Sequence, residues 1–410
     1  MPVNLDLSPA IPVEGVELVT LSAGVKKDGS ADLVLAKLAE SATTSAVFTQ
    51  SAFAAAPVIV CRNHLNENAG SVRALLINSG NANAGTGEPG LNMAIGHCEA
   101  VAEHLQIPTH SVLPFSTGVI GQLLPDDVMK AGIAKSVSAL GEQDCTSDAH
   151  WQDAAQGIMT TDTQPKITSR QVTVNGSLIT ITGMAKGAGM IQPNMATMLS
   201  YVFTDASISK ADLDQLLLDA VDVSFNSITV DSDTSTNDSL VLSATAKGES
   251  MSPAHAQWGE FKSALIQVCL DLAQAIIRDA EGATKFITVK VNGGKTIDEC
   301  KSVGYAIANS PLVKTAMFAS DANVGRLLMA IGKAGVESLD ASLITVSLGD
   351  VVAFEKAGIA PGYTEERGAA VMAADEIEVT VDLARGDAAA SIYTSDLSHD
   401  YVSINADYRS

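Results

Sequence analysis

The sequence is poor in basic residues and in long apolar runs, and each shortage excludes a class of protein. It has 25 Lys and Arg against 47 Asp and Glu, a net charge of −22, and no cluster of Lys or Arg. Nucleic-acid affinity depends mostly on basic side chains that neutralise phosphates, so we expect no nucleic-acid partner. No uncharged apolar stretch reaches the roughly 18 residues that a membrane span needs, so we expect no membrane partner either.

Cysteine is also scarce. The five cysteines are widely spaced and never form a Cys-x-x-Cys pair. This pattern indicates neither a disulfide framework nor a zinc site, and we expect buried thiols in a reducing compartment. The N-terminus lacks the basic segment and long apolar run of a signal peptide. We therefore predict a cytoplasmic protein that has no metal and no bound organic cofactor.

What remains is the composition of a globular protein, with 410 residues, 46% hydrophobic and 18% charged. This length corresponds to two or three domains. Up to about residue 85, short β-like runs alternate with turns, and we expect each run to be a strand. These runs cover residues 16–21, 31–38, 44–50, 56–62 and 72–78.

Helical patterns and further strands follow. Residues 171–182 alternate on both sides of Asn175-Gly176, the dipeptide typical of a two-residue hairpin turn. Ser209 with Asp212 resembles a capping box and predicts a helix start. The other predicted helices cover residues 91–106, 125–141 and about 255–280, and the other predicted strands cover 286–291, 344–349, 376–383 and 390–397. Strands alternating with amphipathic helices predict an α/β fold of layered sheets and helices.

The segment KGAGMIQPNMATML, residues 186–199, has the residues for an unusual nucleophile. A threonine at position 197 can attack the carbonyl of Ala196, take that acyl group onto its oxygen and become a new N-terminus after ester hydrolysis. Its α-amine, with a pKa near 7.7–8.0, then serves as the base for its own hydroxyl. A glycine loop that leads into a buried strand explains the same residues, and it is the simpler interpretation from residue types alone.

Two other segments have weaker signals. In PFSTGVIGQLLP, residues 114–125, adjacent backbone N–H groups of a glycine-containing turn can converge on an oxyanion. An ordinary turn before the helix that starts at Pro125 is the better interpretation of this segment taken alone. Eight consecutive hydroxyl, acid or amide side chains occupy residues 231–238, and a solvated loop between strands explains them adequately.

Taken in order, seven motifs resemble the ornithine acetyltransferase family, also called glutamate N-acetyltransferase or ArgJ. They are NSGNANAGTG, STGVIG, MTTDTQPK, GMAKGAGMIQPNMATML, RDAEGATKF, SPLVKTA and DYVSINADYRS. The resemblance implies a layered sandwich like that of L-aminopeptidase/D-esterase relatives. It also implies self-cleavage between Ala196 and Thr197, which divides the chain into an α part, residues 1–196, and a β part, residues 197–410. The two parts are expected to stay associated as an α2β2 assembly.

The same resemblance implies residue roles. Thr197 is the nucleophile, and Thr117 and Gly118 form the oxyanion hole. The substrate contacts implied are Thr160, with Thr161 and Thr163 as neighbouring alternatives, Lys186, Thr197, Glu281, Asn405 and Ser410. A lysine suits a substrate carboxylate and a glutamate suits an ammonium group. The implied reaction moves the acetyl group of N2-acetylornithine to glutamate through an acetyl-Thr197 ester, with acetyl-CoA as a further possible donor.

The sequence departs from the family pattern in SDANVGRLL, residues 320–328, where Ala322 and Val324 replace proline and tryptophan. Arg409 is a smaller departure. We expect these changes to affect local packing or substrate preference rather than the reaction class. Two alternatives stay open: a hydrolase or aminopeptidase that uses the same N-terminal threonine with water as acceptor, and an uncleaved amino-acid-binding protein that has lost the chemistry.

Overall fold

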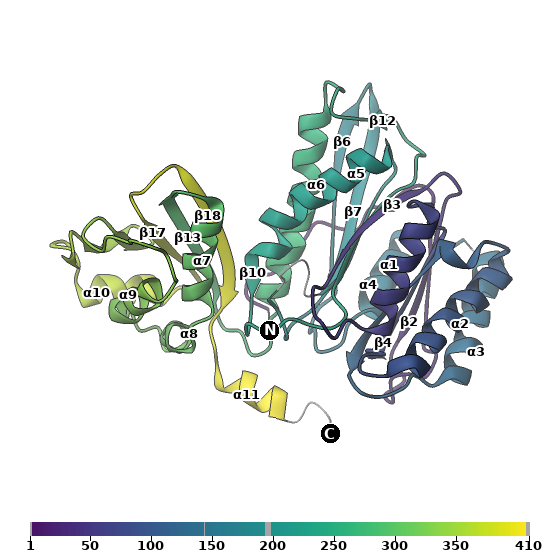
Figure 1. Cartoon of the computed structure of the whole chain (residues 1–410), viewed down its shortest axis with the longest axis horizontal. Coiled ribbons are helices and arrows are strands. Elements are labelled where there is room, and N and C mark those ends of the chain that lie inside the picture. Colours follow the sequence, from purple (N-terminus) through teal and green to yellow (C-terminus); the bar gives the residue numbers. More distant parts are fainter. Residues whose placement is uncertain (1, 143, 193–197, 407–410) are drawn as a thin grey trace.

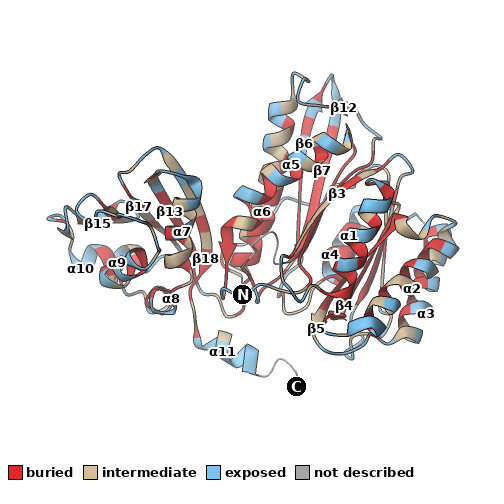
Figure 2. Cartoon of the chain, in the orientation of Figure 1, coloured by how far each residue is buried: buried red, intermediate tan, exposed pale blue. Residues whose placement is uncertain are grey.

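The computed structural model describes residues 2–142, 144–192 and 198–406, and it has a larger and a smaller lobe (Figure 1). The larger lobe stacks two β-sheets face to face and covers both outer faces with helices. The smaller lobe is a third sheet with helices packed against it. Figure 2 shows that the buried residues follow the strands and the inner faces of the helices in both lobes. The predicted layered α/β architecture is confirmed.

The first sheet has the strand order β1-β2-β4-β5. Its strands are β1 (Val16–Leu21), β2 (Leu33–Leu38), β4 (Ala74–Asn81) and β5 (Val112–Val119). The helices α1 (Ala56–Asn68), α2 (Gly87–Leu105) and α3 (Asp126–Glu142) pack on its outer face, with the short 3-10 turn η1 (Thr109–Ser111) before β5. Strands β4 and β5 run parallel, so both end at the same edge of the sheet.

The strand expected at residues 56–62 is wrong, because this segment begins helix α1. Pro57 lies in the first turn of the helix, where its missing N–H costs no hydrogen bond and its fixed φ suits the helix. Val60 packs into the core beneath the first sheet, and Cys61 is completely buried. Periodicity alone does not distinguish a short apolar run in a strand from one in a buried helix, and tertiary packing decided the outcome here.

The second sheet has the strand order β3-β11-β8-β7-β6. Its strands are β3 (Thr43–Phe48), β6 (Lys166–Val174), β7 (Ser177–Lys186), β8 (Leu199–Thr204) and β11 (Ser239–Ala244). The predicted hairpin is confirmed, since β6 and β7 pair through Asn175 and Gly176, which both have positive φ, 52° and 89°. Aromatic and aliphatic side chains from both sheets and from α4 (Asp148–Gly157) form one core between the sheets.

Two helices cover the outer face of the second sheet, namely α5 (Lys210–Val223) and α6 (Trp258–Arg278). Helix α5 starts where the sequence predicts, because the hydroxyl of Ser209 accepts a hydrogen bond from the Asp212 N–H. Short elements complete the lobe: β9 (Ser207–Ile208), β12 (Ser250–Met251) and the 3-10 turn η2 (Phe225–Ser227). Among the described helices, none is long and apolar enough to cross a membrane.

The third sheet forms the smaller lobe, with the order β10-β18-β13-β17-β14-β15-β16. The four predicted late strands appear in it as β13 (Phe286–Gly294), β14 (Thr345–Leu348), β17 (Glu376–Asp382) and β18 (Ala388–Ser395). The other strands are β10 (Ile228–Thr229), β15 (Val351–Glu355) and β16 (Gly358–Ile359). The helices are α7 (Ile297–Ala308), α8 (Pro311–Phe318), α9 (Val324–Gly332) and α10 (Glu365–Met372), and a last helix, α11 (His399–Ala406), projects away from the sheet (Figure 1).

Candidate active site

A cavity of about 270 Å³ lies at one end of the two stacked sheets. Strands β5 and β7 end at this cavity, and the parallel strands β8 and β11 begin there. The loop after α6 and the last helix, α11, close it from the side of the smaller lobe. Because the ends of several strands and two loops meet here, residues far apart in the sequence share one space.

The predicted oxyanion residues lie together at the end of β5. Gly118 has φ 131°, and a Cβ atom there would lie 2.3 Å from the carbonyl carbon of Gly80, so only glycine fits. Thr117 is 8% exposed and lines the cavity. Its Oγ1 accepts a hydrogen bond from Lys186 Nζ at 3.1 Å, which leaves the hydroxyl hydrogen to donate into the cavity. A donor in this position can stabilise a developing oxyanion.

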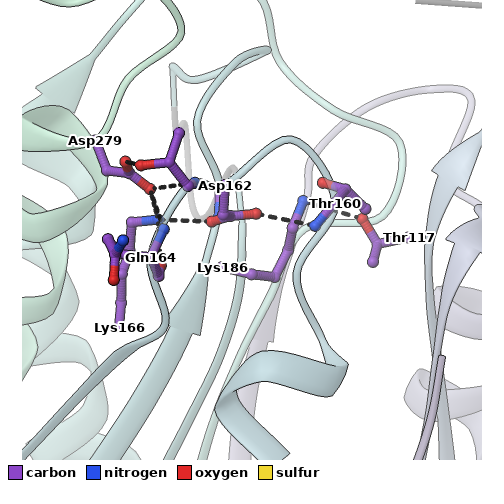
Figure 3. Close-up of polar contacts among 9 residues, drawn as sticks. Thr117, Thr160, Asp162, Gln164, Lys166, Lys186 and Asp279 are labelled. Atoms are coloured by element: carbon purple, nitrogen blue, oxygen red, sulfur yellow. Dashed lines mark hydrogen bonds and ion pairs between the residues drawn. The ribbon is translucent and has the colours of Figure 1, made fainter. Parts of the chain in front are cut away.

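Lys186 ends β7, is only partly buried and lines the cavity. Its side chain points toward Thr117 (Figure 3). Burial lowers the pKa of its ammonium group, although the negative charges of Asp162, Asp238 and Glu281 oppose that shift. Among the described residues, its hydrogen-bond partner is a neutral hydroxyl, that of Thr117. The ammonium group therefore keeps capacity for a carboxylate ligand, with which it would form charge-assisted hydrogen bonds.

A buried carboxylate, Asp162, fixes the wall behind Lys186 (Figure 3). It accepts from the backbone N–H of Thr160 at 3.0 Å and of Gly187 at 2.6 Å, and it pairs with Lys166 Nζ at 2.7 Å. Burial alone would raise the pKa of this carboxyl, but Lys166, Lys186 and the Gly187 N–H bring the pKa below its usual range. Asp162 thus holds two cavity-lining segments in place through their backbones.

The acidic side of the cavity is Glu281, 9% exposed, in the loop after α6. Its backbone N–H donates to the carbonyl of Ala188 at 2.9 Å, and its Oε2 accepts from Asn405 Nδ2 of α11 at 2.7 Å. Gly189 lies against the carboxylate, because a Cβ there would come within 2.4 Å of Glu281 Oε2. This carboxylate is placed to bind an ammonium group inside the cavity.

Six of the predicted site residues line this one cavity: Thr117, Gly118, Thr160, Lys186, Glu281 and Asn405. Thr161 also lines it, whereas Thr163 lies behind the wall, where its N–H donates to Asp279 Oδ2 at 2.9 Å. Ala196, Thr197 and Ser410, for which the sequence predicts site roles, lie outside the described residues. The next described residue after Thr197, Met198, lines the cavity.

The polar loop of residues 231–238 contributes more than the sequence indicates. Asn237 and Asp238 line the cavity, and Asn237 Nδ2 donates to the carbonyls of Ala82 at 2.6 Å and Ser116 at 2.9 Å. These bonds join the loop to the first sheet beside the oxyanion residues. The sequence signal that could have revealed this role is the position of the loop in the chain. The loop immediately precedes the apolar strand β11, which pairs with the strand that follows Thr197.

Two of the departures from the family pattern, Ala322 and Val324, lie elsewhere, and the third, Arg409, falls outside the described residues. Ala322 and Val324 are 7% and 5% exposed in the core of the smaller lobe, and neither lines the cavity. Asn323 between them caps α9, its side chain accepting from the Arg326 N–H at 3.2 Å. The substitutions therefore concern the packing of the smaller lobe.

The residues in the cavity suit an amino-acid substrate. A lysine and a glutamate in its lining match a ligand that has both a carboxylate and an ammonium group, and the Thr117 hydroxyl lies beside the lysine. Within the described ranges, no group of His, Cys, Asp or Glu side chains has the geometry to hold a metal ion.

Comparison with known proteins identifies the family of this chain. The ArgJ family model matches residues 17–410. Two curated relatives, both called arginine biosynthesis bifunctional protein ArgJ, come from Pseudomonas syringae pv. tomato and Pseudomonas fluorescens. Each is 50% identical over 413 aligned residues, which cover 100% of this chain and 100% of the relative.

Solved structures also match. The argJ protein of Bacillus halodurans is 40% identical, with 50% of this chain and 97% of that chain covered and a TM-score of 0.48. The ornithine acetyltransferase of Mycobacterium tuberculosis, complexed with ornithine, is 32% identical, with 46% and 96% covered and a TM-score of 0.39. The family match confirms the predicted resemblance and, with it, an enzyme of arginine biosynthesis: the chain belongs to the ArgJ family.

Proposed function

We propose that this chain is a self-cleaving acetyltransferase that moves the acetyl group of N2-acetylornithine to glutamate through an acetyl-Thr197 ester. The observation that supports this most is the cavity itself. It gathers the predicted oxyanion and substrate residues from β5, β7, α11 and two loops, directly beside the start of β8. Family membership supports the same reaction class.

The reaction follows from the chemistry of these groups. The α-amine of Thr197 takes the proton of its own hydroxyl, whose oxygen attacks the acetyl carbon of the donor. The negative charge that develops on the acetyl oxygen is held by donors of Thr117 and Gly118. Lys186 binds the carboxylate and Glu281 the ammonium group of the amino acid. Ornithine leaves, and the amine of glutamate attacks the acetyl ester to give N-acetylglutamate.

Cleavage between Ala196 and Thr197 would not separate the two parts. Strands β6 and β7 come before the cleavage site and β8 comes after it, yet β7 pairs with β8 in one sheet. Strand β3 pairs in the same way with β11. The core between the sheets also contains residues of both parts. An α part of residues 1–196 and a β part of residues 197–410 would therefore remain one body, and we propose that two such units form an α2β2 assembly.

The proposal extends to the cell compartment and to a second donor. All five cysteines are buried, as expected for a protein of a reducing compartment, and we place the enzyme in the cytoplasm. We also propose acetyl-CoA as a further acetyl donor. The proposed transfer needs no cofactor besides its substrates.

The test starts with intact-mass analysis of the purified protein and N-terminal sequencing of its fragments. We expect two fragments, the second beginning Thr-Met-Leu-Ser, and a gain of one acetyl group on that fragment after incubation with N2-acetylornithine or acetyl-CoA. Thr197→Ala should abolish both cleavage and transfer, and retained transfer in that variant would refute the mechanism. Acetate release that is unaffected by glutamate would instead indicate a hydrolase, and a single uncut chain would indicate a binding protein.

A further inference from the structure

Asp238 lies in the wall of the cavity, and the proposed reaction gives its carboxyl group no role. Asp238 is 2% exposed and lines the cavity with Lys186 and Met198. Its Oδ2 atom is buried and has no hydrogen-bond partner among the described residues. A buried polar atom without a partner costs free energy, so it usually marks a place that a ligand or a reacting group fills.

The position of Asp238 is fixed relative to β8, the strand that follows Thr197. Strands β8 and β11 are parallel, with Ser239 opposite Leu199, and the Ser239 N–H donates to the carbonyl of Met198 at 2.8 Å. The backbone carbonyl of Asp238 accepts from the Thr49 N–H at 2.9 Å. The backbone of Asp238 is thus held beside Met198, the residue that follows Thr197, in the wall of the cavity.

The surroundings favour the neutral form of this carboxyl. Burial raises its pKa well above the usual range, and hydrogen bonds from Ser235 and the charge of Lys186 only partly oppose this shift. Lys186, on β7, is the charged side chain that faces it, and Glu281 faces Lys186 from the loop after α6. A carboxyl whose pKa is raised binds a proton more readily than an exposed one, so it can accept a proton and give it back.

We propose that Asp238 Oδ2 is the proton acceptor for the incoming amino acid and the proton donor to the leaving one. This inference rests on the proposed acetyl transfer and completes its proton balance. Glutamate enters as an ammonium ion with three N–H protons, and the amide nitrogen of its product keeps one. Two protons must therefore leave that nitrogen while its bond to the acetyl carbon forms and the ester bond of Thr197 breaks.

The two protons have different destinations. One passes through the α-amine of Thr197 to its own Oγ, which is restored as a hydroxyl. The other goes to Asp238, which becomes a neutral carboxylic acid. In the donor half-reaction the same steps run in reverse: the departing ornithine nitrogen receives one proton from the Thr197 hydroxyl and one from Asp238, and it leaves as an ammonium ion. Asp238 therefore returns to its starting state after each full cycle.

The test compares two acceptors on the isolated acetyl-enzyme. Glutamate arrives as an ammonium ion, whereas hydroxylamine is a neutral amine at about pH 7 and has one proton fewer to lose. In Asp238→Asn we expect the reaction of the acetyl-enzyme with glutamate to slow by about 10²–10⁴-fold, the usual contribution of a general acid or base. Hydroxylamine should react at the wild-type rate. Asp233→Asn, the same change at an exposed position of the same loop, should leave both rates unchanged.

The other outcomes separate the two proposals. Equal slowing with both acceptors, or no slowing with either, would refute the role of Asp238 and leave the acetyl transfer intact. Failure of the wild-type protein to form an acetyl-enzyme would refute the transfer itself, and the role of Asp238 with it.

A measurement on the wild-type protein keeps the idea testable if Asp238→Asn does not self-cleave. The ratio of the glutamate rate to the hydroxylamine rate removes the titration of the Thr197 α-amine, which both reactions share. If Asp238 is the proton acceptor, this ratio rises with pH and levels off once Asp238 is ionised, at a pH well below the pKa of the glutamate amine. A ratio that rises in proportion to the free amine of glutamate up to that pKa would refute the proposal.

Discussion

Two lysines on adjacent strands show how differently this protein uses the same side chain. Lys166 begins β6 and Lys186 ends β7, and in the pairing of these strands Lys166 lies opposite Ala185. Asp162 lies between the two side chains (Figure 3). Lys166 is completely buried, with Asp162 Oδ1 at 2.7 Å and Asp279 Oδ2 at 2.6 Å, whereas Lys186 donates to a neutral hydroxyl and opens into the cavity.

The pKa shifts of the two lysines have opposite signs for this reason. Burial by itself would lower the pKa of both lysines. Two carboxylates in direct contact with Lys166 raise its pKa instead. Among the described residues no carboxylate is hydrogen-bonded to Lys186, so burial determines the direction of its shift. A fully paired charge stabilises the wall of the site, and an incompletely paired charge remains available to a ligand. The contrast predicts that mutation of one lysine affects mainly stability and mutation of the other affects mainly substrate affinity.

Removal of Lys166 should have the largest effect. Lys166→Met leaves Asp162 and Asp279 buried without their cation, and breaking a buried pair from one side typically costs about 3–5 kcal/mol. We expect the free energy of unfolding to fall by about that amount, measured by urea denaturation at neutral pH. A loss below about 1 kcal/mol would contradict the view of Lys166 as the main support of this wall.

The acid sensitivity of this wall should follow from Asp162. Its pKa in the folded state lies below the value of about 4 in the unfolded chain, so its stabilising contribution is present above that value and is lost as the pH falls. Asp162→Asn should reduce the free energy of unfolding near neutral pH by about 1–3 kcal/mol and flatten its decline in acid. As a control, Asp153→Asn changes an exposed carboxylate, and its free energy of unfolding should fall in acid in parallel with that of the wild type. If the free energy of unfolding of Asp162→Asn falls equally steeply, other groups cause the acid sensitivity.

The network around these lysines also marks the limit of sequence reasoning. Asp279 reaches Lys166 across 113 residues of sequence, so no local pattern reveals the pair. Local signals worked where the cause is local, as in the hairpin at Asn175 and the helix cap at Ser209. They failed at Pro57, where an apolar run suits a strand and a buried helix equally and packing against the first sheet decided. Site residues such as Lys186 were predicted from motif resemblance, and only the fold brings them into one cavity.

Substitution of Lys186 should separate affinity from stability. Lys186→Met removes a charge whose folded-state pKa is lowered, so the free energy of unfolding at neutral pH should stay the same or rise. Loss of a hydrogen-bonded charge to the substrate carboxylate should cost about 1.5–3 kcal/mol, or about a 10- to 100-fold fall in kcat/KM. Steady-state kinetics with N2-acetylornithine and urea denaturation of the same variant measure both quantities. Destabilisation as large as that of Lys166→Met would remove the distinction between the two lysines.

The smallest effect should distinguish two adjacent threonines that both line the cavity. The Thr160 N–H donates to Asp162 Oδ2 at 3.0 Å, and the same carboxylate pairs with Lys166. The backbone that carries the Thr160 hydroxyl is therefore fixed. Thr160→Val keeps the shape and removes one hydrogen-bonding group, and we expect kcat/KM to fall by up to about tenfold, for a loss of about 1 kcal/mol. Thr161→Val is the matched control and should retain near wild-type kinetics, because no hydrogen bond among the described residues fixes Thr161, whereas one fixes the Thr160 backbone. If Thr161→Val lowers kcat/KM more than Thr160→Val does, Thr161 is the substrate contact. The hydrogen bond from the Thr160 N–H to Asp162 then fixes the backbone without positioning a substrate-binding hydroxyl.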